Sequence, residues 1–359
     1  MANTLAWGFV GLESLMGQRV SQVGAEVVFK AVEESATEHT RQINALLASL
    51  AERTTLYSER FYLPGAGTLQ PLDEWGNPLP VREEGYYDVA YPIQGGGTAW
   101  GDNRITRALM QVEEANRYTL ESLKRDADWL RRHVMAALFD NVAWTFDDQL
   151  HGNITIQPLA NNDAVVYTRT GGTTSTDNHY LAQAAAIADA ADPFDDIYSE
   201  LMEHPSNDGP VVVYVPTDLV SSIEALTAFI EIGDPDLIYG ASVTQVEADE
   251  TLLDEIRGPG DEVHGKVDKC WIVEWRALPD NYMIAHARGG GPVLRMREYE
   301  AVALQGFFPE RFSPDGNTLV TRMLRYAGFG VVNRIGALAY RIGNASYGIP
   351  TGYDAPLAV

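Results

Sequence analysis

The sequence predicts an α+β protein built around one helix of unusual length. Residues 102–151 contain no Gly or Pro, and apolar side chains recur there about every 3.7 residues, which indicates a helix. Runs of alternating or β-branched residues, separated by Gly and Pro, flank this stretch and indicate strands. With 359 residues, of which 45% are hydrophobic, the chain is long enough to bury a sizeable core.

A weaker helical pattern comes first. Apolar residues such as Val20, Val28 and Ile43 recur with helical spacing over residues 18–60, and the first Pro of the chain is Pro64. We therefore expect a helical arm before Pro64.

The segment 64–97 predicts a long hairpin. Residues 87–93 alternate apolar and polar side chains, as a strand does, and residues 73–78 have the composition of a turn. Because the tip has little apolar content, we expect the hairpin to project from the body. Trp75 at the tip either anchors in a pocket of a neighbouring molecule or packs within its own loop.

The long helix is predicted over residues 102–147, with Asp102 or Asn103 as its N-cap. At about 1.5 Å per residue, its roughly 36–45 residues would span about 55–65 Å. Charged side chains exclude a membrane helix, and the spacing is not the strict repeat of a coiled coil. We expect a spine against which sheets pack. Its arginines form either a solvated face or salt bridges between subunits: Arg104, Arg107, Arg117, Arg125, Arg131 and Arg132.

Strands and helices alternate after the long helix, which predicts a mixed α/β domain. Strands are expected at residues 153–169, 210–215, 270–277 and 282–287. Helices are expected at residues 182–202 and 219–231, the second capped by Thr217 or Asp218. Residues 171–177 are expected to be a flexible loop, and residues 292–342 long strands that bend at Gly328 and Gly330, followed by a surface tail.

The charge of the chain is strongly negative and unevenly distributed. The formal net charge is −24, and residues 183–290 alone hold 22 acidic and 5 basic residues. This charge disfavours binding to nucleic acid or anionic lipid, because phosphate binding depends on clustered Lys and Arg. No stretch reaches the roughly 18 apolar residues of a membrane span, and the start lacks the basic region of a signal peptide. We expect a soluble protein with no membrane partner.

The sequence predicts no catalytic, cofactor or metal site. The seven His show no HxxxH or HExxH spacing, and Cys270 is the only Cys, which we expect to be buried and inert. The Gly-rich run 95–101 lacks the ending of a phosphate-binding loop and is expected to be a hinge. Ser221 and Ser222 lack the setting of a hydrolase nucleophile. Paired acids are ascribed to the acidic composition: Asp126 and Asp128, Asp147 and Asp148, Asp195 and Asp196, Asp234 and Asp236.

The order of these elements resembles the HK97-like fold of major capsid proteins from tailed double-stranded DNA bacteriophages. Residues 210–219 (PVVVYVPTDL) look like the opening strand and helix of that family's axial domain, and residues 277–285 (ALPDNYMIA) like a late axial strand. Residues 325–342 look like the closing strands of its peripheral domain. The resemblance spans about residues 55–345 and rests on the order of short patterns.

The resemblance implies a division of the chain into six parts. These are an N-terminal helical arm (1–63), an E-loop (64–101), a peripheral domain (102–182) with the spine helix (102–147), an axial domain (183–288), peripheral strands (289–345) and a C-terminal tail (346–359). The spine would then hold the E-loop and the axial domain at a fixed distance from each other.

The implied function is structural and not enzymatic. The subunit would assemble with itself into pentamers and hexamers of an icosahedral head that encloses double-stranded DNA without reading its sequence. The same comparison implies assembly in the host bacterial cytoplasm, a portal, a decoration protein, and either a separate scaffolding protein or direct assembly without one. It implies no cofactor. The four Lys lie outside the E-loop, so we expect no covalent cross-link through it: Lys30, Lys124, Lys266 and Lys269.

Three other interpretations of the protein's function remain open. An encapsulin-like nanocompartment would share the fold and enclose protein cargo. A carboxylate-dependent enzyme such as a glycoside hydrolase would suit the acidic and aromatic composition, and would require a cleft with paired acids. A tail or baseplate component would assemble into rings or tubes.

Overall fold

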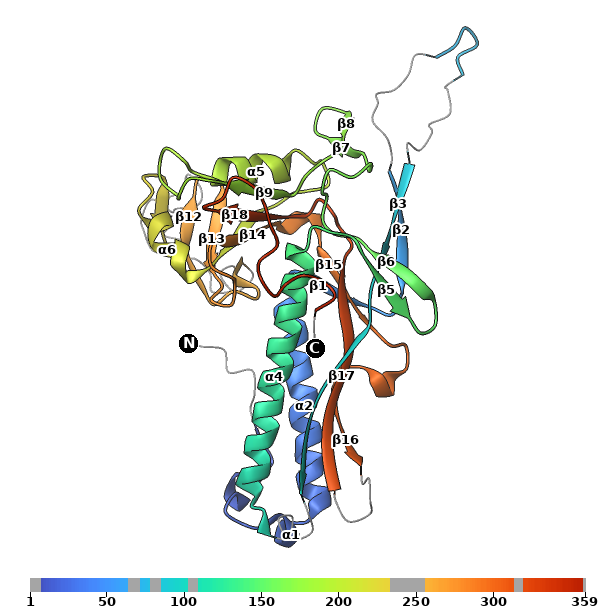
Figure 1. Cartoon of the computed structure of the whole chain (residues 1–359), viewed down its shortest axis with the longest axis vertical. Coiled ribbons are helices and arrows are strands. Elements are labelled where there is room, and N and C mark those ends of the chain that lie inside the picture. The colour runs from blue at the N-terminus through green and yellow to red at the C-terminus, as the bar shows by residue number, and fades with distance from the viewer. Residues whose placement is uncertain are drawn as a thin grey trace.

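The computed structural model describes residues 8–63, 72–77, 85–102, 109–232, 256–312 and 319–357. Two long helices and a five-stranded sheet form one part, which we call the rod (Figure 1). A seven-stranded sheet with two short helices forms the second part, the α/β body, at one end of the rod. A hairpin projects from that same end. Among the helices described here, none has both the length and the apolar character needed to cross a membrane.

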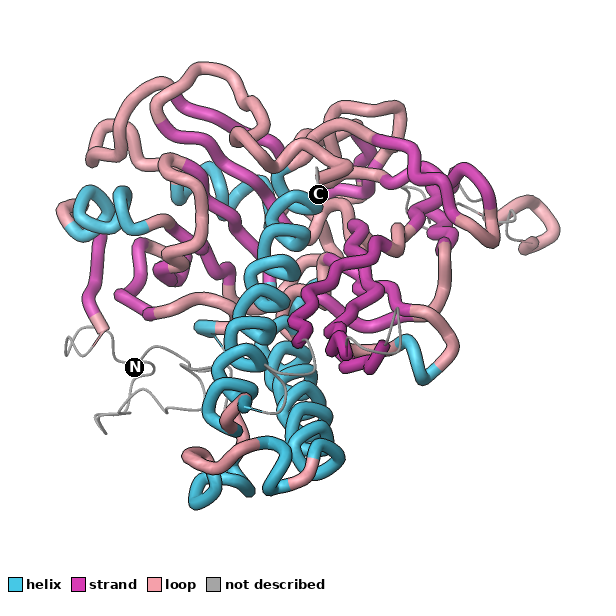
Figure 2. The backbone as a smooth tube through the Cα atoms, turned by 60° about the horizontal axis from the view of Figure 1, so that its bottom comes forward, coloured by secondary structure: helices cyan, strands magenta, loops and turns pink. Residues whose placement is uncertain are grey.

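The two long helices of the rod lie side by side (Figures 1 and 2). Helix α2 spans Ala25–Leu47 and α4 spans Val112–Phe139. The 28 residues of α4 correspond to about 42 Å at 1.5 Å per residue. Their apolar stripes meet in a shared core that also receives side chains of the sheet: Val28, Val32, Ala36, Val112, Ala115, Leu123, Phe307 and Met323.

Helix α4 is shorter than the predicted spine at residues 102–147. Asp102 is the last residue of a strand, and Gln111 precedes the helix with extended backbone angles. At the other end, the backbone of Asp140 is extended, and its carboxylate accepts hydrogen bonds from the backbone N–H groups of Val142 and Ala355. The absence of Gly and Pro from residues 102–151 therefore did not predict where the helix ends. At its C-terminal end, the chain leaves the helix where the Asp140 side chain accepts these two hydrogen bonds. Residues 103–108 lie outside the described residues.

Strand β17 (Leu319–Val331) is the central strand of the rod's sheet. One edge pairs with β4 (Gln94–Asp102), and the other pairs first with β16 (Phe307–Phe312) and then with β15 (Leu294–Glu298). Strand β1 (Ala51–Thr54) adds a parallel pairing to β15. At about 3.3 Å per residue, the 13 residues of β17 cover roughly the same length as α4.

The Gly-rich run 95–101 lies within β4, so the prediction of a hinge there was wrong. The indole of Trp129 on α4 lies 3.0 Å from where a Cβ of Gly96 would stand. Glycine thus lets the helix approach the sheet closely. Gly328 has a similar role in β17, because a Cβ there would overlap the carbonyl group of Pro92.

The predicted helix over residues 18–60 is also interrupted and shorter. A 3-10 turn (η1, Val10–Leu15) and a single helical turn (α1, Val20–Val23) come first, and Gly24 with φ 105° separates α1 from α2. After Leu47, the chain becomes strand β1, because its backbone pairs with β15. This segment packs into the rod and is not a separate arm.

The projecting hairpin consists of β2 (Ser58–Leu63) and β3 (Gly85–Ala90), paired antiparallel. It starts before the predicted segment 64–101, and β4 at the end of that segment belongs to the rod. A second hairpin, β5 (Trp144–Asp148) with β6 (Gly152–Ile156), packs beside it. A third, β7 (Tyr167–Arg169) with β8 (Thr173–Ser175), occupies most of the predicted flexible loop.

The seven strands of the α/β body follow the order β11, β12, β13, β10, β14, β18, β9. Their bounds are β9 (Tyr180–Gln183), β10 (Val211–Val215), β11 (Phe229–Glu231), β12 (Glu262–Val267), β13 (Cys270–Glu274), β14 (Tyr282–Ala287) and β18 (Ala337–Ile342). All five residues of β10 are buried because both faces of the sheet are covered. Val211, Val213 and Val215 pack against α5 and α6, whereas Val212 and Tyr214 belong to the core that contains the end of α4.

Both helices of the α/β body are shorter than predicted. Helix α5 spans Phe194–Met202, not 182–202, because Pro193 starts it and Asp192 accepts a hydrogen bond from the Phe194 N–H. Helix α6 spans Thr217–Glu224, and the rest of the predicted segment 219–231 contains strand β11. Neither Thr217 nor Asp218 is its N-cap, which is Pro216.

The chain crosses between the two parts more often than predicted. Strand β18 lies within the predicted peripheral segment 289–345, yet it pairs with β14 and β9 in the α/β body. Short 3-10 turns, η3 (Arg288–Gly290) and η4 (Val302–Leu304), precede and follow β15. The C-terminal segment packs on the end of α4, where the Tyr347 hydroxyl donates to the Phe139 carbonyl at 2.7 Å.

Candidate functional sites

A buried ion pair joins the three long elements of the rod. Arg325 of β17 donates two hydrogen bonds to Asp126 of α4, from Nε to Oδ1 at 2.6 Å and from Nη2 to Oδ2 at 2.8 Å. Nε2 of His39 on α2 lies 2.9 Å from Asp126 Oδ2. All three residues are at most 5% exposed. A bidentate pair held in this way fixes the relative position of the helices and the strand.

Asp126 therefore differs from its sequence neighbour Asp128. We ascribed both to the acidic composition, and that interpretation was wrong for Asp126. Asp128 is half exposed and pairs with Arg131 three residues later on the same helix. Glu298 extends the buried network, because it accepts a hydrogen bond from Arg53 Nε at 2.9 Å and lies 3.9 Å from Arg325.

The remaining acid pairs have different surroundings where the structure describes them. Asp148 is buried and accepts a hydrogen bond from Arg297 at 2.7 Å, and the same guanidinium donates to the Tyr91 carbonyl at 2.8 Å. Asp195 and Asp196 lie in the exposed first turn of α5. Asp234 and Asp236 lie outside the described residues.

Four of the six spine arginines have partners within the chain. Arg125 donates to the Thr98 hydroxyl at 3.3 Å, Arg131 pairs with Asp128, and Arg132 donates to the Gly352 carbonyl at 3.2 Å. The guanidinium of Arg117 lies 5.5 Å from the ring centre of Tyr118. The other two, Arg104 and Arg107, lie outside the described residues.

The tip of the hairpin, residues 72–77, is an exposed but well-bonded turn. Asp73 Oδ1 accepts hydrogen bonds from the backbone N–H groups of Trp75 and Asn77, both at 2.8 Å. These bonds lower the pKa of Asp73, with the Asn77 N–H as the largest cause. The side chain of Trp75 is 87% exposed, so among the described residues it does not pack into its own loop.

The base of the hairpin has a buried face and an exposed face. Phe61 stacks on Tyr87 with ring centres 5.4 Å apart, and Tyr87 meets Tyr167 of the third hairpin edge to face. On the opposite face, Arg60 pairs with Asp88. Tyr62 and Tyr86 are 59% and 56% exposed there, respectively. A partly exposed face that is rich in aromatic side chains is typical of protein–protein contact surfaces.

The lone Cys270 is completely buried in β13. Burial raises the pKa of its thiol to about 12. This confirms the expectation of a buried thiol, which is unreactive because it stays protonated.

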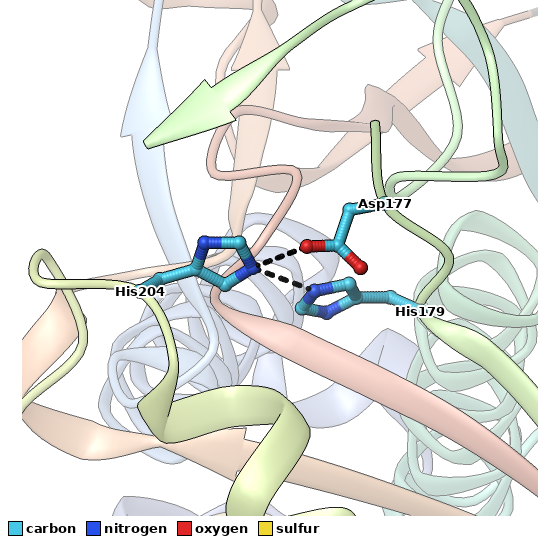
Figure 3. Close-up of side chains that lie close together, drawn as sticks. All are labelled: Asp177, His179 and His204. Carbon is cyan, nitrogen blue, oxygen red and sulfur yellow. Dashed lines mark hydrogen bonds and ion pairs between the residues drawn. The ribbon is translucent and has the colours of Figure 1, made fainter. Parts of the chain in front are cut away.

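A cluster of three buried titratable residues lies at the edge of the α/β body (Figure 3). His204 Nε2 lies 2.9 Å from Asp177 Oδ2 and 3.2 Å from His179 Nε2. All three residues are at most 2% exposed. Asp177 and His179 come from the segment between β8 and β9, and His204 follows α5. We call these residues the Asp177 cluster.

Burial and the neighbouring groups shift the protonation of the Asp177 cluster. Burial lowers the pKa of His179 to about 4, so this imidazole is neutral at physiological pH. Burial is the largest single effect on Asp177 and opposes its ionisation, but the neighbouring polar groups, with His204 first among them, together outweigh burial and lower the pKa of that carboxyl. Arg169 lies 3.0 Å from Glu203 and 3.5 Å from Asp177.

Sequence reasoning did not bring these residues together. Asp177 and His179 have the alternate spacing of side chains on one face of an extended segment, which was the available signal. His204 lies 25 residues further on, beyond a strand and a helix, so no short motif links it to them.

Comparisons with known proteins agree with this architecture. No protein-family model matches the sequence, and a search of curated proteins finds no match. A solved structure from Mycobacterium phage Patience superposes with a TM-score of 0.66 at 18% identity, over 95% of each chain. The capsid structure of the cyanophage P-SCSP1u gives a TM-score of 0.49 at 10% identity, over 82% of this chain and 86% of that one. A virus-like particle from Pyrococcus furiosus gives a TM-score of 0.43 at 11% identity, over 87% of this chain and 99% of that one.

The first of these superpositions covers 95% of each chain. The latter two are weaker and add no further argument. We conclude that this chain has the HK97-like α+β fold.

Proposed function

We propose that this chain is the major capsid protein of a bacteriophage, a shell subunit that assembles into an icosahedral head around double-stranded DNA. The observation that carries the proposal is the HK97-like fold over almost the entire chain, with a projecting hairpin and a separate α/β body on one rod. Pentamers and hexamers joined at their rims close a shell, because heterologous contacts close when their rotations complete a ring.

The rod sets the angle between contacts in this proposal. Its two ends are held apart by α4 and β17, which are tied together by the buried pair of Asp126 and Arg325. The hairpin and the α/β body lie at the same end of the rod. The expectation that the rod holds them at a fixed distance from each other remains part of the proposal. The rod also separates both from the end that carries α1.

The hairpin is the proposed E-loop, which overlaps a neighbouring subunit. Its tip presents Trp75 from a turn already held by Asp73, so little conformational entropy is lost when it docks. A large aromatic side chain that enters a neighbour's pocket is a typical anchor of protein interfaces.

The α/β body is the proposed axial domain, which meets its symmetry mates at the centre of a capsomer. The segment 183–290, which supplies both helices and most strands of this body, holds 22 acidic and 5 basic residues. Close approach of several copies would be repulsive at low salt, and exposed charges are screened within about 10 Å at 0.1 M salt. We therefore expect salt or divalent ions to promote assembly; assembly that is insensitive to ionic strength would contradict this arrangement.

The proposal excludes a covalent cross-link through the hairpin. Lys30 and Lys124 lie on α2 and α4, whereas Lys266 and Lys269 lie in or beside β12 and β13. Assembled shells boiled in detergent should release monomers, and a ladder of covalent oligomers would contradict this part of the proposal. A scaffolding protein, a portal and a decoration protein are further proposed partners.

The test is assembly of the purified full chain, measured by sedimentation velocity and negative-stain microscopy across a range of salt concentrations. Closed icosahedral particles are expected. Tubes or open rings would favour a tail or baseplate component, and a monomer that cleaves glycosidic bonds would favour a glycoside hydrolase. Particles from infected cells should contain DNA, whereas particles filled with one protein would favour the encapsulin-like alternative.

A further inference from the structure

The imidazoles of the Asp177 cluster are oriented by backbone carbonyl groups. His179 Nδ1 lies 2.7 Å from the Ala337 carbonyl oxygen, and His204 Nδ1 lies 3.2 Å from that of Thr168. A carbonyl oxygen only accepts, so each Nδ1 carries the hydrogen and donates it. An imidazole that carries its hydrogen on Nδ1 has a lone pair on Nε2, and the two Nε2 atoms lie 3.2 Å apart.

Asp177 adds a third acceptor to the same point (Figure 3). Its Oδ2 lies 2.9 Å from His204 Nε2 and, although buried, has no hydrogen-bond donor among the described residues. Three converging acceptors repel one another unless a cation lies between them. A buried carboxylate oxygen without a hydrogen-bond donor is an independent sign that a bound water molecule or cation completes the cluster.

The surrounding charges do not supply that cation in full. Arg169 is the neighbouring guanidinium, and it lies closer to Glu203 than to Asp177. Carboxylate oxygens of Glu200 and Glu203 also lie within 4.8 Å of Asp177. Three carboxyl groups thus lie around one guanidinium.

We propose that the Asp177 cluster binds a divalent transition metal of the Zn²⁺ class. The ligands are Nε2 of His179, Nε2 of His204 and Oδ2 of Asp177. Two imidazole nitrogens at about 2.0–2.1 Å from a tetrahedral Zn²⁺ lie roughly 3.3 Å apart, close to the 3.2 Å in this structure. Nδ1–H groups that donate to backbone carbonyls are the usual outer contacts of metal-binding His, because they fix the tautomer that leaves Nε2 free. Glu203 or a water molecule would supply the fourth ligand.

The metal would have a structural role. The ligands are at most 2% exposed, so the site does not open to a substrate. It would link the segment before β9 directly to the turn after α5. Along the chain, β9 and α5 lie between these two segments. Tyr167 meets both His204 and Tyr87 of the hairpin at 6.1 Å between ring centres. Metal binding would therefore also stiffen the base of the hairpin. This role goes beyond the proposed shell function and does not depend on it.

The test uses the unassembled full chain, first as purified and then after removal of metals with a chelator. Elemental analysis should find one metal ion per chain before chelation. The chelated protein should unfold at a lower temperature, and one equivalent of Zn²⁺ should restore the original midpoint. Co²⁺ in place of Zn²⁺ should give the intense visible absorption bands of a tetrahedral site with nitrogen and oxygen ligands.

Two variants and a matched control locate the site. His204→Gln and Asp177→Asn should lose the bound metal, the effect of Zn²⁺ on thermal unfolding and the Co²⁺ bands. His264→Gln should keep all three, although its imidazole lies near Glu224 and Glu274 in another grouping of possible ligands. The Co²⁺ spectrum of the unmodified chain decides the outcome even where a variant does not fold.

Two results would overturn the proposal. Wild-type protein that holds no metal and unfolds at the same temperature with and without Zn²⁺ would mean that a proton shared by the two imidazoles completes the cluster. Loss of metal binding in His264→Gln alone would assign the metal to the other grouping.

Discussion

Replacing Arg325 with Met tests whether the rod is locked by its buried ion pair. The change removes both hydrogen bonds to Asp126 but keeps a long apolar stem in place of the guanidinium. Asp126 then remains buried, with His39 Nε2 2.9 Å from its Oδ2. The side chains of Asp126 and Arg325 are only 2% and 1% exposed, respectively, so water does not replace the lost partner.

The expected cost follows from this burial. Removing one partner of a buried pair costs about 3–5 kcal/mol, because an uncompensated charge remains in a medium of low polarity. Replacing both partners with apolar residues leaves no such charge. The double variant Asp126→Leu/Arg325→Met should therefore be less destabilised than Arg325→Met alone. Arg131→Met is the matched control: its half-exposed pair with Asp128 contributes at most about 1 kcal/mol.

The assay is urea unfolding of unassembled subunits, followed by tryptophan fluorescence at a concentration where sedimentation shows monomers. The free energy of unfolding at zero denaturant gives the cost of each change. Equal losses for Arg325→Met and Arg131→Met would refute the reasoning. The reasoning would also be refuted if the double variant lost as much free energy of unfolding as Asp126→Leu and Arg325→Met lose when added together.

Three further predictions address other parts of the chain. Gly328→Ala should lower stability by about 1–3 kcal/mol in thermal unfolding, because its Cβ would overlap a neighbouring backbone carbonyl, whereas Gly17→Ala, with open space around it, should not. Trp75→Ala should leave the unfolding temperature of the subunit unchanged but reduce the yield of sedimenting particles, and Val302→Ala, also highly exposed, should reduce neither. Burial lowers the pKa of His286 from 6.5 to about 4. Wild-type stability should therefore fall as pH drops from about 6.5 towards 4, because over this range the unfolded chain binds a proton at His286 and the folded chain does not. His286→Gln should lose stability less steeply over that pH range in urea titrations, and an identical slope would contradict this assignment.

Local pattern and tertiary contact explain which parts of the fold were predictable. The apolar repeat of α4 was visible in the sequence because a helix buries one face at a fixed period. Its ends were not visible. At the C-terminal end, Asp140 accepts a hydrogen bond from the backbone N–H of Ala355, which is 215 residues away in the sequence. The strand β10 was correctly predicted from its run of Val, whose burial on both faces requires no alternation.

Errors arose where a distant partner decides the local structure. The Gly-rich run 95–101 has the composition of a hinge, yet it is a strand because its backbone pairs with β17, and Gly96 leaves room there for Trp129. Asp126 appeared to be one acid among many, and its role depends on Arg325, which is 199 residues away. The Asp177 cluster joins residues on either side of a helix and a strand. Side chains brought together by tertiary packing leave no spacing signature in a single sequence.

The most direct test of the central claim is a cryo-electron microscopy reconstruction of particles formed by the full chain. The proposal predicts a closed icosahedral shell. In it, the α/β body should surround the fivefold and sixfold axes, and the hairpin with Trp75 should lie across a neighbouring subunit. A preparation that remains monomeric under all assembly conditions would contradict the proposal. A shell in which each hairpin folds back on its own subunit would also contradict it.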